Sequence, residues 1–333
     1  MYSWHKQIWE RLKSNRDSLP HALLFYGQKG TGKCDFARQL AKCLICEAPL
    51  VHWMACNHCN ACQCFEKDTH PDVRTIQPEA QQEHATDSKN ANEKLPRAAQ
   101  RILIGQIRTL EDYVYVGSHR GGVKIIMIRP AEAMNIQASN ALLKMLEEPP
   151  AKTLFILITN QIRLLLPTIL SRCEKIQLPT PSKAEAMKWL AEKNIAKPEL
   201  RLAQTGNAPL DAHTLNDEEH WQQREIFLSQ LGRRDIDPIV IAELFHRYDL
   251  SKIIGWLQKW IYDLISLRCA GHVRYHLDYE TALKSLSVKL SPKDLTRYYR
   301  YLVYGQRVSN HPLNPKLVLE ELLLGYRALV SFG

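Results

Sequence analysis

The chain has 333 residues, of which 45% are hydrophobic and 24% charged, so it can form two or three domains with at least one sizeable core. Its apolar runs fall well short of the roughly 18 residues of a membrane-spanning helix, and the N-terminal MYSWHKQIWERLK lacks the apolar stretch of a signal peptide. We therefore expect a cytoplasmic protein without membrane contact. The net charge of +9 suits an anionic partner such as nucleic acid, although it would serve solubility equally well.

The first elements predicted along the chain are a helix, a buried strand, a glycine-rich loop and a second helix. The first helix is expected over 4–16, the strand over 21–26 and the second helix over 33–44. The loop, residues 27–34, reads GQKGTGKC and fits the phosphate-binding pattern G-x-x-x-x-G-K-[ST] at every position but the last. A strand before the loop and a helix after it are the context that this pattern requires.

The last residue of this loop limits what the loop can do. Gly27, Gly30, Gly32 and Lys33 remain, and they could still hold a phosphate at the start of the helix. Cys34 stands where a Ser or Thr hydroxyl would bind Mg²⁺, which disfavours a soft thiol. The loop is therefore compatible with phosphate binding, or with a purely structural connection, and Cys34 disfavours Mg²⁺-dependent chemistry.

A cysteine-rich insert follows the second helix. Its pattern C-x9-C-x2-C-x2-C comprises Cys46, Cys56, Cys59 and Cys62. Two cysteines with two residues between them can turn both thiolates onto one ion. Four sulfur ligands leave no position for water, so we expect a structural Zn²⁺. Four other residues could substitute for a ligand: Cys64, His52, His58 and His70. Unrelated buried thiols are a weaker alternative because the spacing is regular.

Strands and helices alternate through the following hundred residues. Residues 77–100 are polar and are expected to form a surface loop. Strands are predicted over 124–128 and 153–158, with a helix over 137–147 between them. This alternation indicates an α/β domain with a mainly parallel sheet, which ends near Leu178.

The residues after the strand over 124–128 argue against ATP hydrolysis. A P-loop hydrolase holds Mg²⁺ with an acidic residue at the end of a second strand, but Arg129 and Pro130 follow this strand. The acids nearby in the sequence do not follow it directly: Glu132, Glu147 and Glu148. Since both oxygen ligands of the metal are missing, we expect no hydrolysis by this chain.

Strand signals stop after residue 179. Two short helices are expected over 182–193 and 197–203, then a turn over 206–209, and from about residue 215 the pattern is helical. One broad apolar stripe has helical spacing: Ile253, Trp256, Leu257, Trp260, Ile261 and Leu264. We interpret its aromatic residues as core packing rather than as a platform for nucleic-acid bases.

A P-loop α/β domain whose helix runs into a four-cysteine module resembles the bacterial clamp-loader subunits, which are AAA+ proteins. Other stretches carry the same resemblance: HALLF at 21–25, THPD at 69–72, QIR at 106–108, NALLKMLEEPP at 140–150, LPTILSRC at 166–173 and NPKLVLEELL at 314–323. Motor subunits of that family should keep G-K-[ST] and an acidic pair, so this chain resembles a subunit without its own ATP hydrolysis. A nucleotide-sensing arginine would be expected near Pro209, where Leu210 and Asp211 stand instead.

This resemblance implies an AAA+ domain over 1–178 with the zinc module at 46–64, a small helical lid over 179–213 and a helical collar for oligomerisation over 214–333. It implies a subunit of the DNA polymerase III holoenzyme that helps load the sliding clamp onto primed DNA. The partners would be the ATPase motor and delta subunits, the clamp and DNA, in the nucleoid region of the cytoplasm. An active ATPase with an unusual metal site and a zinc-containing DNA-binding module remain alternatives.

Basic residues are expected in two roles. In the resembling family the arginine of Ser171-Arg172-Cys173 points across the subunit boundary, so Arg172 is the candidate for an arginine finger that acts in trans. The alternative is an ordinary ion pair, for instance with Glu174. Five other residues are candidates for DNA backbone contacts, or else for a solvated surface: Arg97, Arg101, Arg108, Arg120 and Lys124.

Overall fold

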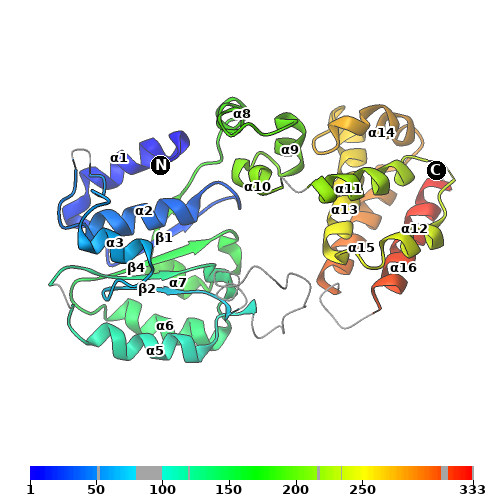
Figure 1. Cartoon of the computed structure of the whole chain (residues 1–333). Helices are drawn as coiled ribbons and strands as arrows, with labels where there is room; N and C mark the ends of the chain where they lie inside the picture. The colour runs from blue at the N-terminus through cyan, green and yellow to red at the C-terminus, as the bar shows by residue number, and fades with distance from the viewer. Residues whose placement is uncertain are drawn as a thin grey trace. The chain divides into compact units, whose positions relative to one another are not determined.

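The chain folds into two compact units, Met1–Pro181 and Ser182–Gly333, which are described separately. The computed structural model describes residues 1–50, 53–79, 100–118, 121–215, 218–233, 235–308 and 314–331 (Figure 1). Within these residues no helix has the length and apolar character to span a membrane. Most of the polar loop expected over 77–100, residues 80–99, lies outside the described residues.

A five-stranded, all-parallel sheet organises the first unit, in the order β2-β3-β4-β1-β5. Its strands are β1 (Ala22–Tyr26), β2 (Val73–Ile76), β3 (Lys124–Ile128), β4 (Thr153–Thr159) and β5 (Glu174–Gln177). β3 and β4 are buried along their whole length, as expected for central parallel strands covered on both faces. The three central strands confirm the sequence prediction, whereas the edge strands β2 and β5 were not predicted.

Helices cover both faces of this sheet (Figure 1). Successive side chains of β1 point to opposite faces of the sheet. Leu23 and Phe25 pack into one core cluster, and Ala22 and Leu24 pack into the other. The helices of the first cluster are α1 (Lys6–Ser14), α2 (Lys33–Ile45) and α3 (Asn60–Glu66). Those of the second are α5 (Ile104–Tyr115), α6 (Ile136–Glu147) and α7 (Pro167–Arg172). The predicted α/β class is confirmed.

The second unit is helical and has two separate hydrophobic cores. A small core holds together three short helices: α8 (Lys183–Glu192), α9 (Pro198–Gln204) and α10 (Pro209–Thr214). Sequence analysis predicted the first two of these, but only a turn where α10 begins. The separate cores fit a division into lid and collar, although the boundaries at 178 and 213 remain a prediction.

The larger core surrounds α13 (Leu250–Ala270), and every residue of the predicted apolar stripe is buried there. The surrounding helices are α11 (Glu218–Leu231), α12 (Pro238–Phe245), α14 (Glu280–Ser287), α15 (Pro292–Val308) and α16 (Pro315–Ser331). Trp260 donates a hydrogen bond of 2.9 Å to the Tyr326 hydroxyl, which donates in turn to the Leu231 carbonyl at 2.9 Å. This chain of hydrogen bonds ties α13, α16 and α11 together inside the apolar core.

One buried carboxylate fixes the segment that follows α13. Asp263, fully buried, accepts hydrogen bonds from the backbone N–H groups of Arg274, Tyr275 and His276 at 2.8–3.2 Å. It also accepts one from Nδ1 of His276 at 2.9 Å, and burial lowers the pKa of that imidazole below its usual range. The buried charge is thus satisfied by four donors of a single turn.

Removing this charge should destabilise the second unit. In Asp263→Asn the new amide nitrogen would face donors, so we expect a loss of roughly 2–3 kcal/mol in the free energy of unfolding. Urea unfolding measures this loss, and hydrogen exchange should rise over residues 271–279. Asp294→Asn, at a half-exposed site on α15, is the matched control. Equal stability of the two variants would contradict this role for Asp263.

Candidate functional site

The glycine loop lies between β1 and α2, as predicted, and two of its glycines are sterically required. Gly27 has a φ of 151°, and a Cβ at this position would lie 2.6 Å from the Leu178 carbonyl oxygen. Gly32 has a φ of 91°, and its Cβ would collide with the ring of Tyr2. Only glycine fits such positions without strain.

The lysine of the loop is directed inward. Lys33 is 4% exposed, and its Nζ donates a hydrogen bond of 2.6 Å to the backbone carbonyl of Gln28. The buried Thr31 hydroxyl donates to the same carbonyl at 2.9 Å. The ammonium group that would meet a phosphate thus binds a carbonyl of the loop itself.

Aromatic residues at the N-terminus cover this loop, which sequence analysis did not predict. The Tyr2 hydroxyl donates to Oδ2 of Asp35 at 2.5 Å, and Trp4 Nε1 donates to the Thr31 carbonyl at 2.9 Å. The Tyr2 and Trp4 rings stack with their centroids 4.8 Å apart. The expected helix over 4–16 is present as a short 3₁₀ turn, Ser3–His5, followed by α1; Trp4 lies in this turn and Tyr2 directly before it.

His5 lies beneath these rings and is fully buried. It packs edge-on against Phe36 of α2, with ring centroids 5.3 Å apart. Burial, together with the N-terminus and Lys33, lowers the pKa of His5 to about 4. The imidazole is therefore neutral at pH 7 and adds no positive charge beside the glycine loop.

A basic residue occupies the position of the expected acidic metal ligand. Arg129 follows β3 directly, and its Nε donates to Oε1 of Gln77 at 3.1 Å. The nearby Glu132 accepts a hydrogen bond from the Asn160 backbone at 3.0 Å. Thus the end of β3 presents a guanidinium, and Cys34 presents a thiol, where Mg²⁺ requires hard oxygen ligands.

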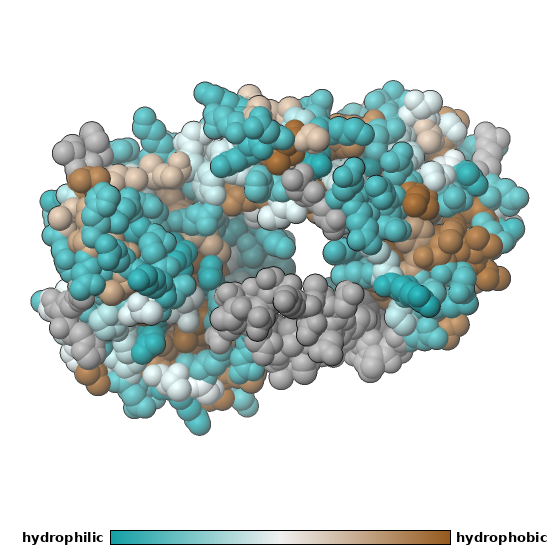
Figure 2. All heavy atoms as spheres, in the orientation of Figure 1, coloured by the Kyte–Doolittle hydropathy of each residue, from teal (hydrophilic) through white to brown (hydrophobic). Residues whose placement is uncertain are grey.

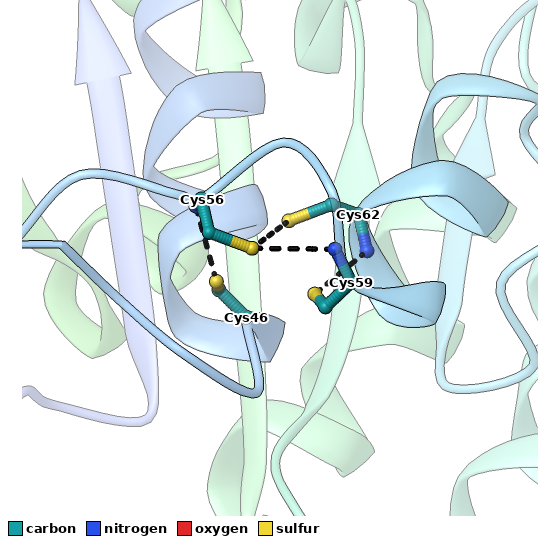
Figure 3. Close-up of side chains that lie close together, drawn as sticks. All are labelled: Cys46, Cys56, Cys59 and Cys62. Atoms are coloured by element: carbon teal, nitrogen blue, oxygen red, sulfur yellow. Dashed lines mark hydrogen bonds between the residues drawn. The ribbon is translucent and has the colours of Figure 1, made fainter.

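The four predicted cysteines converge at one point, with their sulfur atoms all within 4.8 Å of one another (Figure 3). Cys46 follows the last residue of α2, Cys56 lies in the loop, Cys59 caps α3 and Cys62 lies in its first turn. Among the described residues no other His, Cys, Asp or Glu joins this group.

The proposed substitute ligands are placed differently. The Cys64 thiol donates to Oδ1 of Asn60 at 3.2 Å, and Nδ1 of His70 accepts from the Asp72 backbone at 3.1 Å. Neither Cys64, His70 nor His58 belongs to the cysteine cluster, and His52 lies outside the described residues.

Backbone N–H groups point at the sulfur atoms of this cluster. Those of Cys56, Cys59 and Cys62 donate to the Sγ atoms of Cys46, Cys56 and Cys59, at 3.3, 3.3 and 3.4 Å. Such bonds lower the pKa of Cys56 to about 6, whereas burial raises the pKa values of Cys46 and Cys62. Four sulfurs at these distances can hold a metal ion, and backbone donors would stabilise its thiolate ligands.

Arg172 is the last residue of α7 and pairs with an acid other than the expected one. Its guanidinium forms an ion pair with Glu147 of α6, not with Glu174, and donates to the Thr168 carbonyl at 3.2 Å. About a third of the side chain, 33%, is exposed. The guanidinium therefore lies at the protein surface, held by residues of its own chain.

The candidates for DNA contact divide into three groups. Lys124 is 3% exposed and donates to the carbonyls of Tyr113 and Val116, so its assignment as a DNA contact was wrong. Arg101 and Arg108 are exposed. Arg97 and Arg120 lie outside the described residues.

Comparison with known proteins places both units in one family. Residues 4–182 match the family model "DNA polymerase III, delta subunit", and residues 218–327 match the model of its C-terminal part. A DNA polymerase III subunit delta' from Pseudomonas aeruginosa is 32% identical, covering 100% of this chain and 99% of that protein. The subunit delta' of Escherichia coli is 27% identical, over 97% and 94% of the two chains.

Among solved structures, a DNA polymerase III gamma subunit-related protein from Thermotoga maritima aligns with 97% of this chain and 99% of its own. The identity is 19% and the TM-score is 0.47, so the assignment depends on the sequence matches. Those matches span almost the full length of this chain and of its relatives. The chain therefore belongs to the family of DNA polymerase III delta' subunits.

Proposed function

We propose that this protein is a clamp-loader subunit of the DNA polymerase III holoenzyme and helps to place the sliding clamp on primed DNA. The full-length match to delta' subunits carries this conclusion. The P-loop domain without Mg²⁺ ligands agrees with it, since it favours a non-hydrolysing AAA+ subunit over an active ATPase. Such a subunit acts in the cytoplasm, beside the replicating DNA and the motor and delta subunits.

An exposed apolar surface supports assembly with other subunits. α12 and α16 pack against each other, and Figure 2 shows a hydrophobic area over them. Its exposed side chains are Ile239, Val240, Leu244, Leu317 and Leu324, each more than half exposed. Apolar areas of this kind commonly mark protein interfaces, so we assign the segment over 214–333 to subunit contacts, as a collar.

The isolated protein should not hydrolyse ATP. The reason is the combination of Cys34, Arg129 and the inward-facing Lys33, which leaves no metal site and no free ammonium for the phosphates. We expect turnover at background level in a phosphate-release assay, unchanged in Lys33→Ala and in the control Lys29→Ala. Turnover that Lys33→Ala abolishes and Lys29→Ala leaves intact would refute this prediction.

The cysteine cluster should hold one structural Zn²⁺. The four sulfur atoms lie within 4.8 Å of one another, and four thiolates are a ligand set that zinc prefers. About one equivalent of zinc should copurify, and Cys59→Ser should lose it and destabilise the first unit, because metal binding contributes folding free energy. Cys64→Ser, next to the cluster but outside it, should retain the metal. Metal analysis and thermal unfolding measure both effects, and zinc-free reduced wild type would disprove the site.

Arg172 is proposed as an arginine finger for the ATPase site of a neighbouring subunit. Its support is the partly exposed guanidinium at the end of α7 and the match of Ser171-Arg172-Cys173 to the family pattern. An arginine suits the role because its planar fork can bind two phosphate oxygens as charge develops on the transferred group.

Arg172→Ala should leave the subunit folded and assembled but slow ATP turnover at the neighbouring site. A finger supplied in trans is worth about 10³–10⁵ in rate, so that site should become nearly silent. Turnover of the reconstituted loader with clamp and primed DNA measures this. Arg163→Ala, which removes a charge elsewhere, should retain turnover, and Glu147→Gln, which releases the arginine from a weak ion pair, should slow it far less than Arg172→Ala does. Wild-type turnover in Arg172→Ala would reject the finger.

A further inference from the structure

A polar cavity lies at the β2 edge of the sheet. It has a volume of about 300 Å³. The lining side chains that matter for its chemistry are Arg38, Asp68, Arg74, Gln77 and Arg129. In the sheet order β2-β3-β4-β1-β5, two strands separate β2 from the strand that leads into the glycine loop. None of the loop glycines lines the cavity, which lies beside the ends of β2 and β3 and shares Arg129 with the position of the expected metal ligand.

The cavity carries excess positive charge. Three arginines and one aspartate line it, which leaves two positive charges uncompensated. Arg38 pairs with Asp68 at 3.0 Å, but 73% of that carboxylate side chain is exposed to water. Arg129 donates through Nε to Gln77, and the Arg74 guanidinium lies 5.1 Å from the centre of the Tyr113 ring. Neither of the latter two arginines pairs with a carboxylate in the described residues.

The guanidinium groups are also oriented by their surroundings. Arg38 lies over the Phe65 ring at 5.0 Å, and the bond to Gln77 uses Nε of Arg129, not its two Nη groups. Gln77 directly follows the last residue of β2, and Arg129 directly follows the last residue of β3. Parallel sheets bind their ligands at this end, and arginine forks match the oxygens of a phosphate group.

We propose that this cavity binds a phosphate-bearing anion, through the guanidinium groups of Arg38, Arg74 and Arg129. The group is either a free phosphate or pyrophosphate, or a phosphodiester of bound nucleic acid. Both present the same oxygens to the arginines, and the cavity has the volume of roughly ten water molecules, which leaves room for the anion with its hydration. The proposal does not depend on the loader function.

Calorimetric titration of the full-length protein with pyrophosphate, and with inorganic phosphate, tests whether the ligand is a free anion. Fluorescence anisotropy with a primed DNA duplex tests whether the ligand is a phosphodiester of nucleic acid. Arg129→Gln and Arg38→Gln should each weaken binding about tenfold or more, because each removes a charge-assisted bond. Arg74→Gln gives a third variant with little risk to folding, because this side chain is exposed and contacts the Tyr113 ring without a side-chain hydrogen bond to the described residues. Circular dichroism confirms that every variant is folded.

Arg163→Gln, at an exposed arginine outside the cavity, is the matched control and should bind as the wild type does. If the wild type binds pyrophosphate and the cavity variants do not, the ligand is a free anion. If the wild type binds DNA but not pyrophosphate, and the cavity variants lose the DNA binding, the ligand is the nucleic-acid backbone. If neither ligand binds, or if Arg163→Gln loses as much affinity as the cavity variants, the proposal is overturned.

Discussion

Burial of the central strands on both faces constrains where the first unit can carry chemistry. β3, β4 and β1 lie between two helical layers, so the side chains on both faces of these strands are mostly apolar. Polar groups therefore gather where the strands end, and in a parallel sheet those ends share one edge. The glycine loop after β1 and Arg129 after β3 both lie there. Arg129 thus takes part in both features, because it replaces the acidic metal ligand after β3 and also lines the basic cavity.

The same burial explains which elements could be predicted from the sequence. β3 and β4 read as uninterrupted apolar runs because neither face meets water, and the buried stripe of α13 keeps its helical spacing for a similar reason. β2 and β5 have four residues each, mostly exposed or half-buried, so they give neither an apolar run nor a clear alternation. α10 has six residues, too few for a helical period to stand out.

Site residues were predictable where their partners are close in the sequence. Three of the four cysteines lie within seven residues, so local geometry almost builds the cluster by itself. Other contacts join segments that meet only in the folded chain. Tyr2 covers the glycine loop, Glu147 pairs with Arg172, and Lys124 is buried against the carbonyls of Tyr113 and Val116. No local pattern encodes such contacts, which is why the structure was needed to find them.

The ion pair between Arg172 and Glu147 affects how much side-chain conformational entropy the arginine loses when it acts in a neighbouring subunit. A free arginine side chain samples many rotamers, and fixing it costs up to about 2 kcal/mol. Glu147 and the Thr168 carbonyl already restrict these rotamers before any neighbour arrives. A part-exposed pair contributes only about 0–1 kcal/mol, so the arginine can leave it at little cost. For the proposed finger, Glu147 would act as a weak holder that reduces the disorder to be lost at the transition state.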